Sequence, residues 1–343
     1  MKNLITLLVL TFSIVININA TVWRVNSSLN SDANFSEVQP AIDAAAAGDI
    51  IHIESGSYSG FTVNKQLSLQ GTCYERAPHA AIATPPAPVF INGDVTFAPG
   101  ASGSSISSVN LATSNSEFRI KTNDILITRC KIHTFFFISR YSDGETSITK
   151  TTINNIVVSN TVITSSIQSS TNSYDTLIVT NVLFNNSYIG QISLPTVSSS
   201  SYLRSFSCSF SQCIINSSIF IYNSNFQNSI FENGLDALSN VYSNNVTNCL
   251  FKSAQPTSSN YILGTNNIFG ATDIYDTSSA YWKLSTTTAA IGAGIGGYDI
   301  GIYGGNNPFI PGGYLQQPTI TKLLMPVQVS GNVNIEVEAK VIE

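Results

Sequence analysis

Residues 156–163 read Ile-Val-Val-Ser-Asn-Thr-Val-Ile, and residues 177–184 read Leu-Ile-Val-Thr-Asn-Val-Leu-Phe. Both units are short and rich in β-branched residues, which is typical of strands. Similar units follow the same pattern at 125–132, 224–231, 246–251 and 265–269. Aligned on their last apolar residues, the units are spaced by 31, 21, 47, 20 and 18 residues, and the longest step spans two coils. A spacing near 20 with irregular insertions predicts a parallel β-helix, in which each coil buries its inward residues against its neighbours.

Asparagine recurs at one place in several of these units, as Asn160, Asn181, Asn248 and Asn266 or Asn267. Asn tolerates the left-handed backbone conformation, and its amide can bond to the Asn of the next coil. We therefore expect these residues to form a structural column along the axis rather than a ligand site.

The composition agrees with a stack of uncharged polar coils. Of 343 residues, 43% are hydrophobic but only 10% are charged, against about 25% in an average soluble domain. Disordered chains combine low hydrophobicity with high net charge, so this deficit does not indicate disorder. The net charge of −5 excludes the basic face that nucleic-acid recognition needs, and we expect no nucleic-acid partner.

One helix is predicted, near the N-terminus. Residues 21–26 predict a short strand, and residues 35–48 have helical apolar spacing, with Ser36 as the N-cap and Gly48 as the stop. Residues 49–58 then alternate as a strand that ends in a glycine turn.

This succession, from Gln39 and Ala41-Ile42-Asp43 through Gly48-Asp49-Ile50-Ile51 to Gly56-Ser57-Tyr58, resembles the N-terminal cap of the pectin-lyase-like superfamily. In that family a short amphipathic helix plugs the first coil of a right-handed parallel β-helix. Residues 290–294 and 298–305 resemble the closing coil of exported β-helix proteins. The resemblance implies an all-β, right-handed parallel β-helix solenoid with a short N-terminal capping helix. It does not specify an activity.

We expect four parts: a signal peptide at 1–20, an N-terminal cap and first coil at 21–71, the parallel β-helix at 72–305, and a C-terminal linker and β tail at 306–343. Residues 1–20 have a basic start, an apolar stretch and a cleavage site that ends at Ala20. The apolar stretch is shorter than the roughly 20 residues of a membrane span. We therefore expect a secreted or cell-surface protein whose mature chain has no transmembrane segment.

Two alternating runs, 320–329 and 333–341, flank Ser330-Gly331-Asn332 and predict a hairpin-like tail. This tail either caps the last coil, shielding an open sheet edge, or serves as a sorting segment for export. The alternatives are compatible with each other.

The five cysteines, Cys73, Cys130, Cys208, Cys213 and Cys249, are odd in number, and only two of them are near neighbours. The sequence has no CxxC motif, and its three histidines stand apart, so nothing supports a zinc site. We expect the cysteines to be small buried core residues. We expect no cofactor.

Charged residues gather in the segment 117–150, which is the first place to look for an active surface. Arg129, Lys131 and His133 are two apart, so they are predicted to share one strand face. With Arg140 they are candidates for binding an acidic sugar or for abstracting a proton beside a carboxylate. The alternative is an ordinary solvated strand face.

Asp273 and Asp276 are the candidates for a metal site. Two carboxylates three residues apart in a loop supply only part of the six to eight oxygens that calcium requires. We therefore expect no metal.

The resemblance does not identify catalytic residues in this sequence. Pectate lyases of the superfamily use several Asp residues for calcium and an Arg as proton acceptor, and the polygalacturonase-like branch uses clustered Asp residues with a His-Gly motif. This sequence has neither Asp-Asp nor His-Gly.

We expect an exported, noncatalytic protein that presents a polar surface for carbohydrate binding, adhesion or surface structure. Its partner would be an extracellular polysaccharide or a cell-envelope glycan. The alternative is a divergent polysaccharide lyase or glycoside hydrolase with its site in 117–150. An ice-binding face would need threonines in step from coil to coil, and Thr128, Thr161 and Thr180 are not in step.

Overall fold

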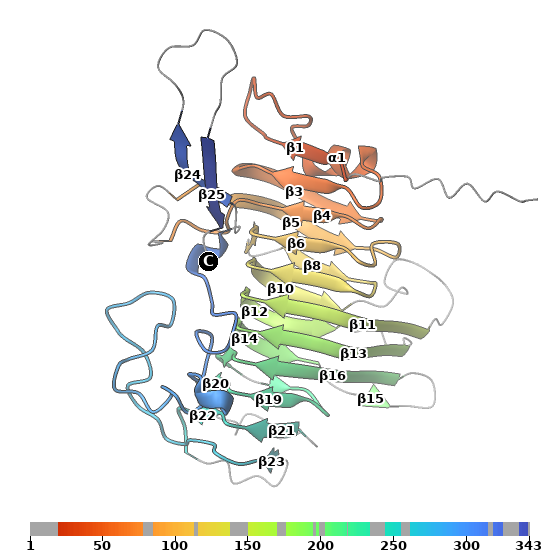
Figure 1. The fold of residues 1–343 in the computed structure, drawn as a ribbon. Coiled ribbons are helices and arrows are strands. Elements are labelled where there is room, and N and C mark those ends of the chain that lie inside the picture. Colours follow the sequence, from red (N-terminus) through yellow and green to blue (C-terminus); the bar gives the residue numbers. More distant parts are fainter. Residues whose placement is uncertain are drawn as a thin grey trace, which may run out of the picture.

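Two large parallel sheets run side by side along the length of the molecule (Figure 1). The computed structural model describes residues 20–77, 85–112, 116–137, 150–169, 176–194, 197–198, 203–217, 219–233, 244–254, 261–314, 318–324 and 336–341. The predicted signal peptide lies outside these residues except for Ala20, and Arg140 lies outside them too. The fold is all-β, as predicted.

The first sheet has 12 strands, paired in parallel except at β15. In order they are β1 Val22–Val25, β2 Ile50–Ile53, β4 Ser68–Gln70, β6 Ser105–Ser107, β9 Ile125–Thr128, β11 Lys150–Ser159, β13 Thr176–Asn185, β16 Leu203–Ser211, β19 Asn225–Gln227, β21 Asn244–Thr247 and β23 Tyr261–Leu263, with β15 Val197–Ser198 beside β16.

The second sheet has 11 strands, and along the chain they are interleaved with the strands of the first sheet. In order they are β3 Gly56–Val63, β5 Val89–Phe97, β7 Asn110–Leu111, β10 Lys131–Phe137, β12 Val162–Ser169, β14 Tyr188–Ser193, β17 Ile214–Ile215, β20 Ile230–Phe231 and β22 Leu250–Phe251; β8 Glu117–Ile120 pairs with β5 and β10, and β18 Ile219–Phe220 pairs with β14.

The chain therefore passes repeatedly from one sheet to the other. The strand pairing shows which residues occupy equivalent positions in successive coils. Val158 pairs with Phe184 and Phe184 with Phe210, whereas Ile163 pairs with Ile189 in the other sheet. The predicted alignment of Ile163 with Phe184 is wrong. Residues 177–184 lie wholly within β13, but residues 156–163 cross from β11 to β12.

Six crossings from the first sheet to the second, those that follow β9, β11, β13, β16, β19 and β21, are tight corners with one residue in the left-handed conformation. These corner residues have φ between 46° and 55°: Arg129, Asn160, Asn186, Gln212, Asn228 and Asn248. Asn is favoured at such positions because its short polar side chain tolerates left-handed φ. Each corner nitrogen also donates to a carbonyl of the following coil, as Asn160 does to Asn185 (3.1 Å), so the corners form a continuous column.

The predicted asparagines thus have the expected left-handed conformation, but they belong to two columns rather than one. Asn160 and Asn248 are corner residues, whereas Asn181 lies inside β13, in a second column with Asp124 and Asn155. In that second column the side chains do bond to each other: the Asn181 amide donates to Asn155, and the Asn155 amide donates to Asp124 (2.8 Å).

The core lies between the two sheets and consists largely of stacked apolar side chains. Phe184, Phe210 and Phe226 come from successive strands, with ring centroids 4.9 and 4.7 Å apart and nearly parallel planes. Parallel, in-register pairing places like residues above one another, so the aromatic rings stack in a column.

At the N-terminal end, the α-helix α1 (Val38–Ala44) buries Val38, Ala41 and Ile42 against the first strands. The predicted helix is too long. Its N-cap is Glu37 rather than Ser36, because Phe35 still bridges to Val25 in extended conformation, and the helix stops at Ala45, before Gly48. The predicted strand 49–58 is two strands, β2 and β3, which belong to different sheets.

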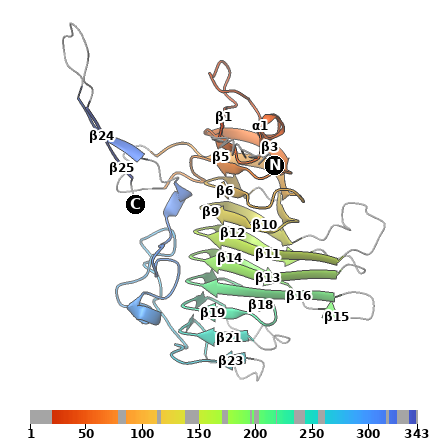
Figure 2. The ribbon, with the colours of Figure 1, turned by 45° about the vertical axis from the view of Figure 1, so that its right-hand side comes forward.

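Beyond β23, residues 264–269 continue the last coil, where Ile268 bridges in parallel to Leu250 and Phe269 stacks on Phe251. Residues 270–314 then form a cover on the outer face of the second sheet (Figures 1 and 2). The segment 290–305, which resembles a closing coil in sequence, lies within this cover. It runs back along the corners: Asn248 donates to Ala293 (3.3 Å), Asn186 to Ile302 (2.8 Å), and Asn160 to Asn307 (3.1 Å). These three corner amides therefore bind the cover.

The C-terminal strands β24 (Pro318–Leu324) and β25 (Glu336–Val341) pair antiparallel as a hairpin, as predicted. Figures 1 and 2 place this hairpin at the end of the stack that holds β1, far from β23. A role in capping the last coil is therefore wrong, because the cover carries the chain back towards the first coils.

Candidate functional site

The candidate site arises where the cover ends. On the outer face of the second sheet, one row of paired residues runs through Lys131, Val162, Tyr188, Ile214 and Ile230. The apolar members at one end are buried beneath cover residues such as Ile300 and Phe309. Towards Lys131 the row becomes polar, and the cover leaves an opening.

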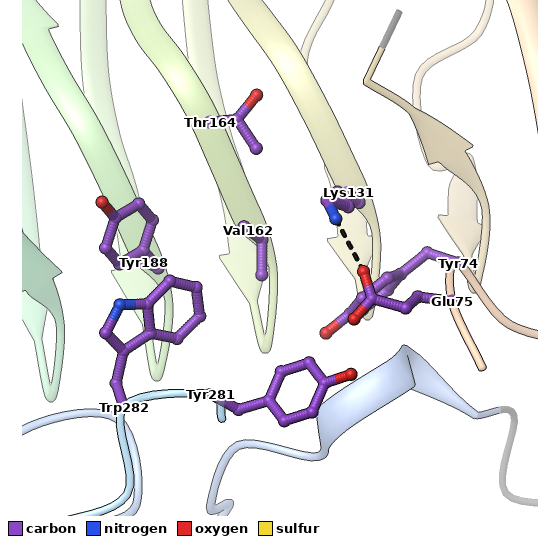
Figure 3. A pocket seen from close by; sticks show the side chains of 8 residues that line it. All are labelled: Tyr74, Glu75, Lys131, Val162, Thr164, Tyr188, Tyr281 and Trp282. Atoms are coloured by element: carbon purple, nitrogen blue, oxygen red, sulfur yellow. Dashed lines mark hydrogen bonds and ion pairs between the residues drawn. The ribbon is translucent and has the colours of Figure 1, made fainter. Parts of the chain in front are cut away.

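This opening is a pocket of about 290 Å³, which Figure 3 shows from close by. Its walls come from the second sheet, from the segment before β5 and from the cover. The lining residues are Tyr74, Glu75, Lys131, Val162, Thr164, Tyr188, Tyr281 and Trp282. Aromatic walls with a few polar groups are the usual composition of a small-molecule site.

Two adjacent cover residues supply one wall. Tyr281 and Trp282 have φ of 66° and 57°, a conformation that costs a side-chain-bearing residue about 1–2 kcal/mol. Trp282 stacks on Tyr188 with centroids 4.1 Å apart, and the Tyr303 hydroxyl donates to the carbonyl of Tyr281 (2.7 Å). Strained residues held by their surroundings cluster at functional sites.

The charged groups of the pocket neutralise each other. Lys131 Nζ lies 2.6 Å from Glu75 Oε2, and each side chain is 28% exposed. Burial raises the pKa of Tyr188 to about 12, and it also raises the pKa of Tyr74 and, together with the Glu75 carboxylate, that of Tyr281. The three phenols are therefore neutral hydroxyls at physiological pH and serve as both donors and acceptors.

Of the predicted residues that the structure describes, only Lys131 lies in this pocket. Arg129 is a half-buried corner residue, and burial lowers its pKa. His133 lies on β10 with Nδ1 2.9 Å from Thr134 Oγ1, beside a register shift. The prediction that Arg129, Lys131 and His133 share one strand face is wrong for Arg129, because the chain turns its corner there; Lys131 and His133 both lie on β10, on either side of the buried Ile132. Arg140 lies outside the described residues.

A separate charged group lies at β5 and β8. Arg119 forms ion pairs with Asp94 and Glu117, both at 2.7 Å. Here Ile120 is a fully buried core residue, and Arg119 is occupied by its two carboxylates.

The candidate metal residues remain apart from any further ligand. Asp276 accepts hydrogen bonds from the backbone nitrogen (2.9 Å) and the hydroxyl (2.7 Å) of Ser278, which makes it a turn residue. Within the described part of the chain, no group of three His, Cys, Asp or Glu residues is arranged to hold a metal ion.

Sequence reasoning missed Glu75 and the aromatic residues of the pocket. Tyr281 and Trp282 carry the only visible signal, since the chain has two tryptophans and this one adjoins a tyrosine in a loop rich in small polar residues. Their partner Tyr188 lies more than 90 residues earlier. No local sequence pattern predicts the path of the cover, which brings these residues together.

A larger cavity of about 640 Å³ shares Tyr281 with the pocket. Leu284, Ile291 and Tyr303 form much of its wall, and Lys283 and Asp299 also line it. Tyr281 therefore separates two neighbouring hollows.

No known protein-family model matches this chain, and no curated protein is significantly similar to it in sequence. In the described part of the chain, no helix has both the length and the apolar character of a membrane span.

Proposed function

We propose that the protein is an exported, right-handed parallel β-helix protein that binds a carbohydrate in the pocket between the second sheet and the cover. The observation that carries this proposal is the pair of strained aromatic residues, Tyr281 and Trp282, facing the polar groups of Lys131, Glu75 and Thr164 (Figure 3). Aromatic side chains offer apolar area for a sugar ring, and the polar groups bond its hydroxyls.

The extracellular setting rests on the first 20 residues and on the resemblance to the pectin-lyase-like superfamily. The short N-terminal helix and the two parallel sheets support that resemblance. A glycan at the cell surface or in the surroundings is the partner that these features favour.

Binding is tested on the purified protein with a glycan array, followed by titration calorimetry of the glycans that bind. We expect Tyr281→Ala and Trp282→Ala to weaken binding at least about tenfold, because buried aromatic anchors dominate binding energies. Phe90→Ala is the matched control: Phe90 is 41% exposed on the same sheet face but does not line the pocket. Full binding by both pocket variants, with circular dichroism unchanged, would overturn the proposal.

A divergent hydrolase or lyase is the second candidate, favoured by the convergence of Asp94 and Glu117 on Arg119. Glycoside hydrolysis needs two nearby carboxylates. Depolymerisation of pectin or alginate that is lost in both Asp94→Asn and Glu117→Gln would place catalysis there. Unchanged polymer length in the presence of wild-type protein excludes it for these substrates.

A further inference from the structure

We propose that Glu75 makes the pocket selective for uncharged sugar residues by occupying Lys131, the one cation among the described residues that line it. This inference rests on the proposed carbohydrate function and names the class of ligand. It makes Glu75 a specificity-determining residue rather than a catalytic one.

Lys131 is placed where an acidic ligand would meet it. It begins β10 and follows the corner, so its side chain points out of the sheet, next to Val162 in the paired strand. A lysine at the mouth of an aromatic pocket would ordinarily recognise a carboxylate, as expected for the basic strip in the sequence.

Glu75 is held in place by its neighbour. The Tyr74 nitrogen donates to the Gly312 carbonyl (2.9 Å), the Gly312 nitrogen donates to the Tyr74 hydroxyl (3.2 Å), and Asn110 donates to the Tyr74 carbonyl (2.9 Å). These bonds tie the segment both to the sheet and to the cover. The Glu75 carboxylate therefore remains beside Lys131 when the pocket is empty.

The charges around the pocket disfavour a further carboxylate. An incoming uronate would lie beside Glu75, and the charge of Glu232, which does not line the pocket, acts on the lining residue Tyr188, where it adds to the effect of burial in raising the pKa. Like charges brought together in a partly desolvated site repel each other and weaken binding. A neutral hydroxyl meets no such penalty, because it can accept from Lys131 and donate to Glu75.

The test uses titration calorimetry to measure the affinities of two matched pairs: mannohexaose with hexamannuronate, and fully methyl-esterified hexagalacturonate with hexagalacturonate. We expect the wild type to bind a neutral oligomer at least about tenfold more tightly than the matching acidic one. Glu75→Gln should raise the affinity for acidic oligomers about tenfold, with a strong salt dependence, and Glu75→Gln/Lys131→Gln should lose that gain.

The charge swap Glu75→Lys/Lys131→Glu keeps a neutral pair and should keep the wild-type preference. If Glu75→Gln fails to fold, Lys131→Gln gives the second measurement: acidic oligomers should lose affinity by a larger factor than neutral ones, so the preference for neutral oligomers should increase.

Equal affinities of the wild type for neutral and acidic oligomers would overturn the selectivity, as would a gain in Glu75→Gln that persists without Lys131. Either result leaves carbohydrate binding intact. Failure of every variant to bind any saccharide on the wider array would instead overturn the proposed function itself.

Discussion

Asn186 takes a left-handed conformation at the corner between β13 and β14, and its buried amide donates to the carbonyls of Ile302 (2.8 Å) and Gly304 (2.7 Å). One residue thus turns the chain and fastens the cover to the stack. The two roles can be separated by substitution, because glycine keeps the backbone conformation and loses only the side-chain bonds.

We expect Asn186→Ala to lower the free energy of unfolding by about 2–4 kcal/mol, since it loses two buried hydrogen bonds and adds the left-handed strain of alanine. Asn186→Gly should cost about 1–2 kcal/mol less. Urea denaturation followed by circular dichroism compares the two variants. Equal costs would mean that the backbone at this corner relaxes when the side chain is removed.

Asp49 is a second residue with a measurable role. Burial raises the pKa of Asp49, but hydrogen bonds from Trp23 Nε1 (2.9 Å), the Thr21 nitrogen (2.9 Å) and the Ala46 nitrogen (2.9 Å) outweigh burial and hold it below its ordinary value. A carboxyl with a lowered pKa stabilises the fold above its unfolded pKa of about 3.9, and this contribution is lost as the pH falls through the folded value.

The wild type should therefore lose stability below about pH 4. Asp49→Asn should lower the free energy of unfolding by about 1–3 kcal/mol at pH 7, but its stability should fall less steeply as the pH decreases below 4. Urea midpoints measured between pH 2.5 and 7 test this. Parallel pH profiles for the two proteins would exclude Asp49 as a source of acid sensitivity.

At the scale of elements, each corner carries an inward hydroxyl or thiol two residues after the strand ends. Thr161 donates to the Ser159 carbonyl (2.9 Å) and accepts from the Cys130 nitrogen (3.4 Å), and the Cys213 thiol donates to the Ser211 carbonyl (3.3 Å). All five cysteines are buried and free, as expected. Three of them, Cys130, Cys213 and Cys249, occupy this corner position, where each thiol donates to the carbonyl two residues earlier, as the serine and threonine hydroxyls do at other corners.

Thr161→Ala should cost about 1–3 kcal/mol because it leaves the Cys130 nitrogen without its acceptor, whereas Thr161→Ser should cost clearly less. Thermal unfolding of both variants provides the comparison. Cys213→Ser should resemble Thr161→Ser, since a serine can make the same bond. A large loss in Cys213→Ser would mean that packing, not hydrogen bonding, sets the residue at this position.

Elements were predictable where a local pattern decides them and not where a corner interrupts them. The alternation in 125–132 is apolar at Ile125 and Ile127 but resumes at Cys130 and Ile132, one position out of step. That shift in the alternation marks the corner at Arg129. From one sequence alone, however, it cannot be distinguished from an irregularity within a single strand. Strand content and parallel pairing were therefore predicted, while the register between coils was not.

The candidate site was predictable only in part for a related reason. Lys131 was identified because charge stands out in an uncharged chain. Glu75 was not, because its partner is 56 residues away, and the distance along the chain gives no sign of the contact. Tyr281 and Trp282 reach the sheet only through the cover, whose direction depends on corner amides such as Asn186 that bind it.

At the scale of the whole molecule, each coil is stabilised by its neighbours, because similar side chains at equivalent positions of successive coils pack on one another. Phe184 is fully buried and its ring stacks on Phe210, whereas the adjacent Leu183 is 36% exposed on the outer face of the same strand. In a stack of this kind, stability is approximately a sum of the coils' own terms and the interfaces between neighbours. A defect in one coil should therefore weaken its neighbours most.

Phe184→Ala should cost about 3–5 kcal/mol, because it leaves a cavity between two stacked coils, and Leu183→Ala should cost less than about 1 kcal/mol. Hydrogen exchange followed by mass spectrometry should show faster exchange in β11, β13 and β16 of the Phe184 variant, and little change in β2 and β4, which lie several coils away. Uniform acceleration along the chain would mean that the stack unfolds as one cooperative unit, and the energy of each interface would then exceed the instability of any single coil.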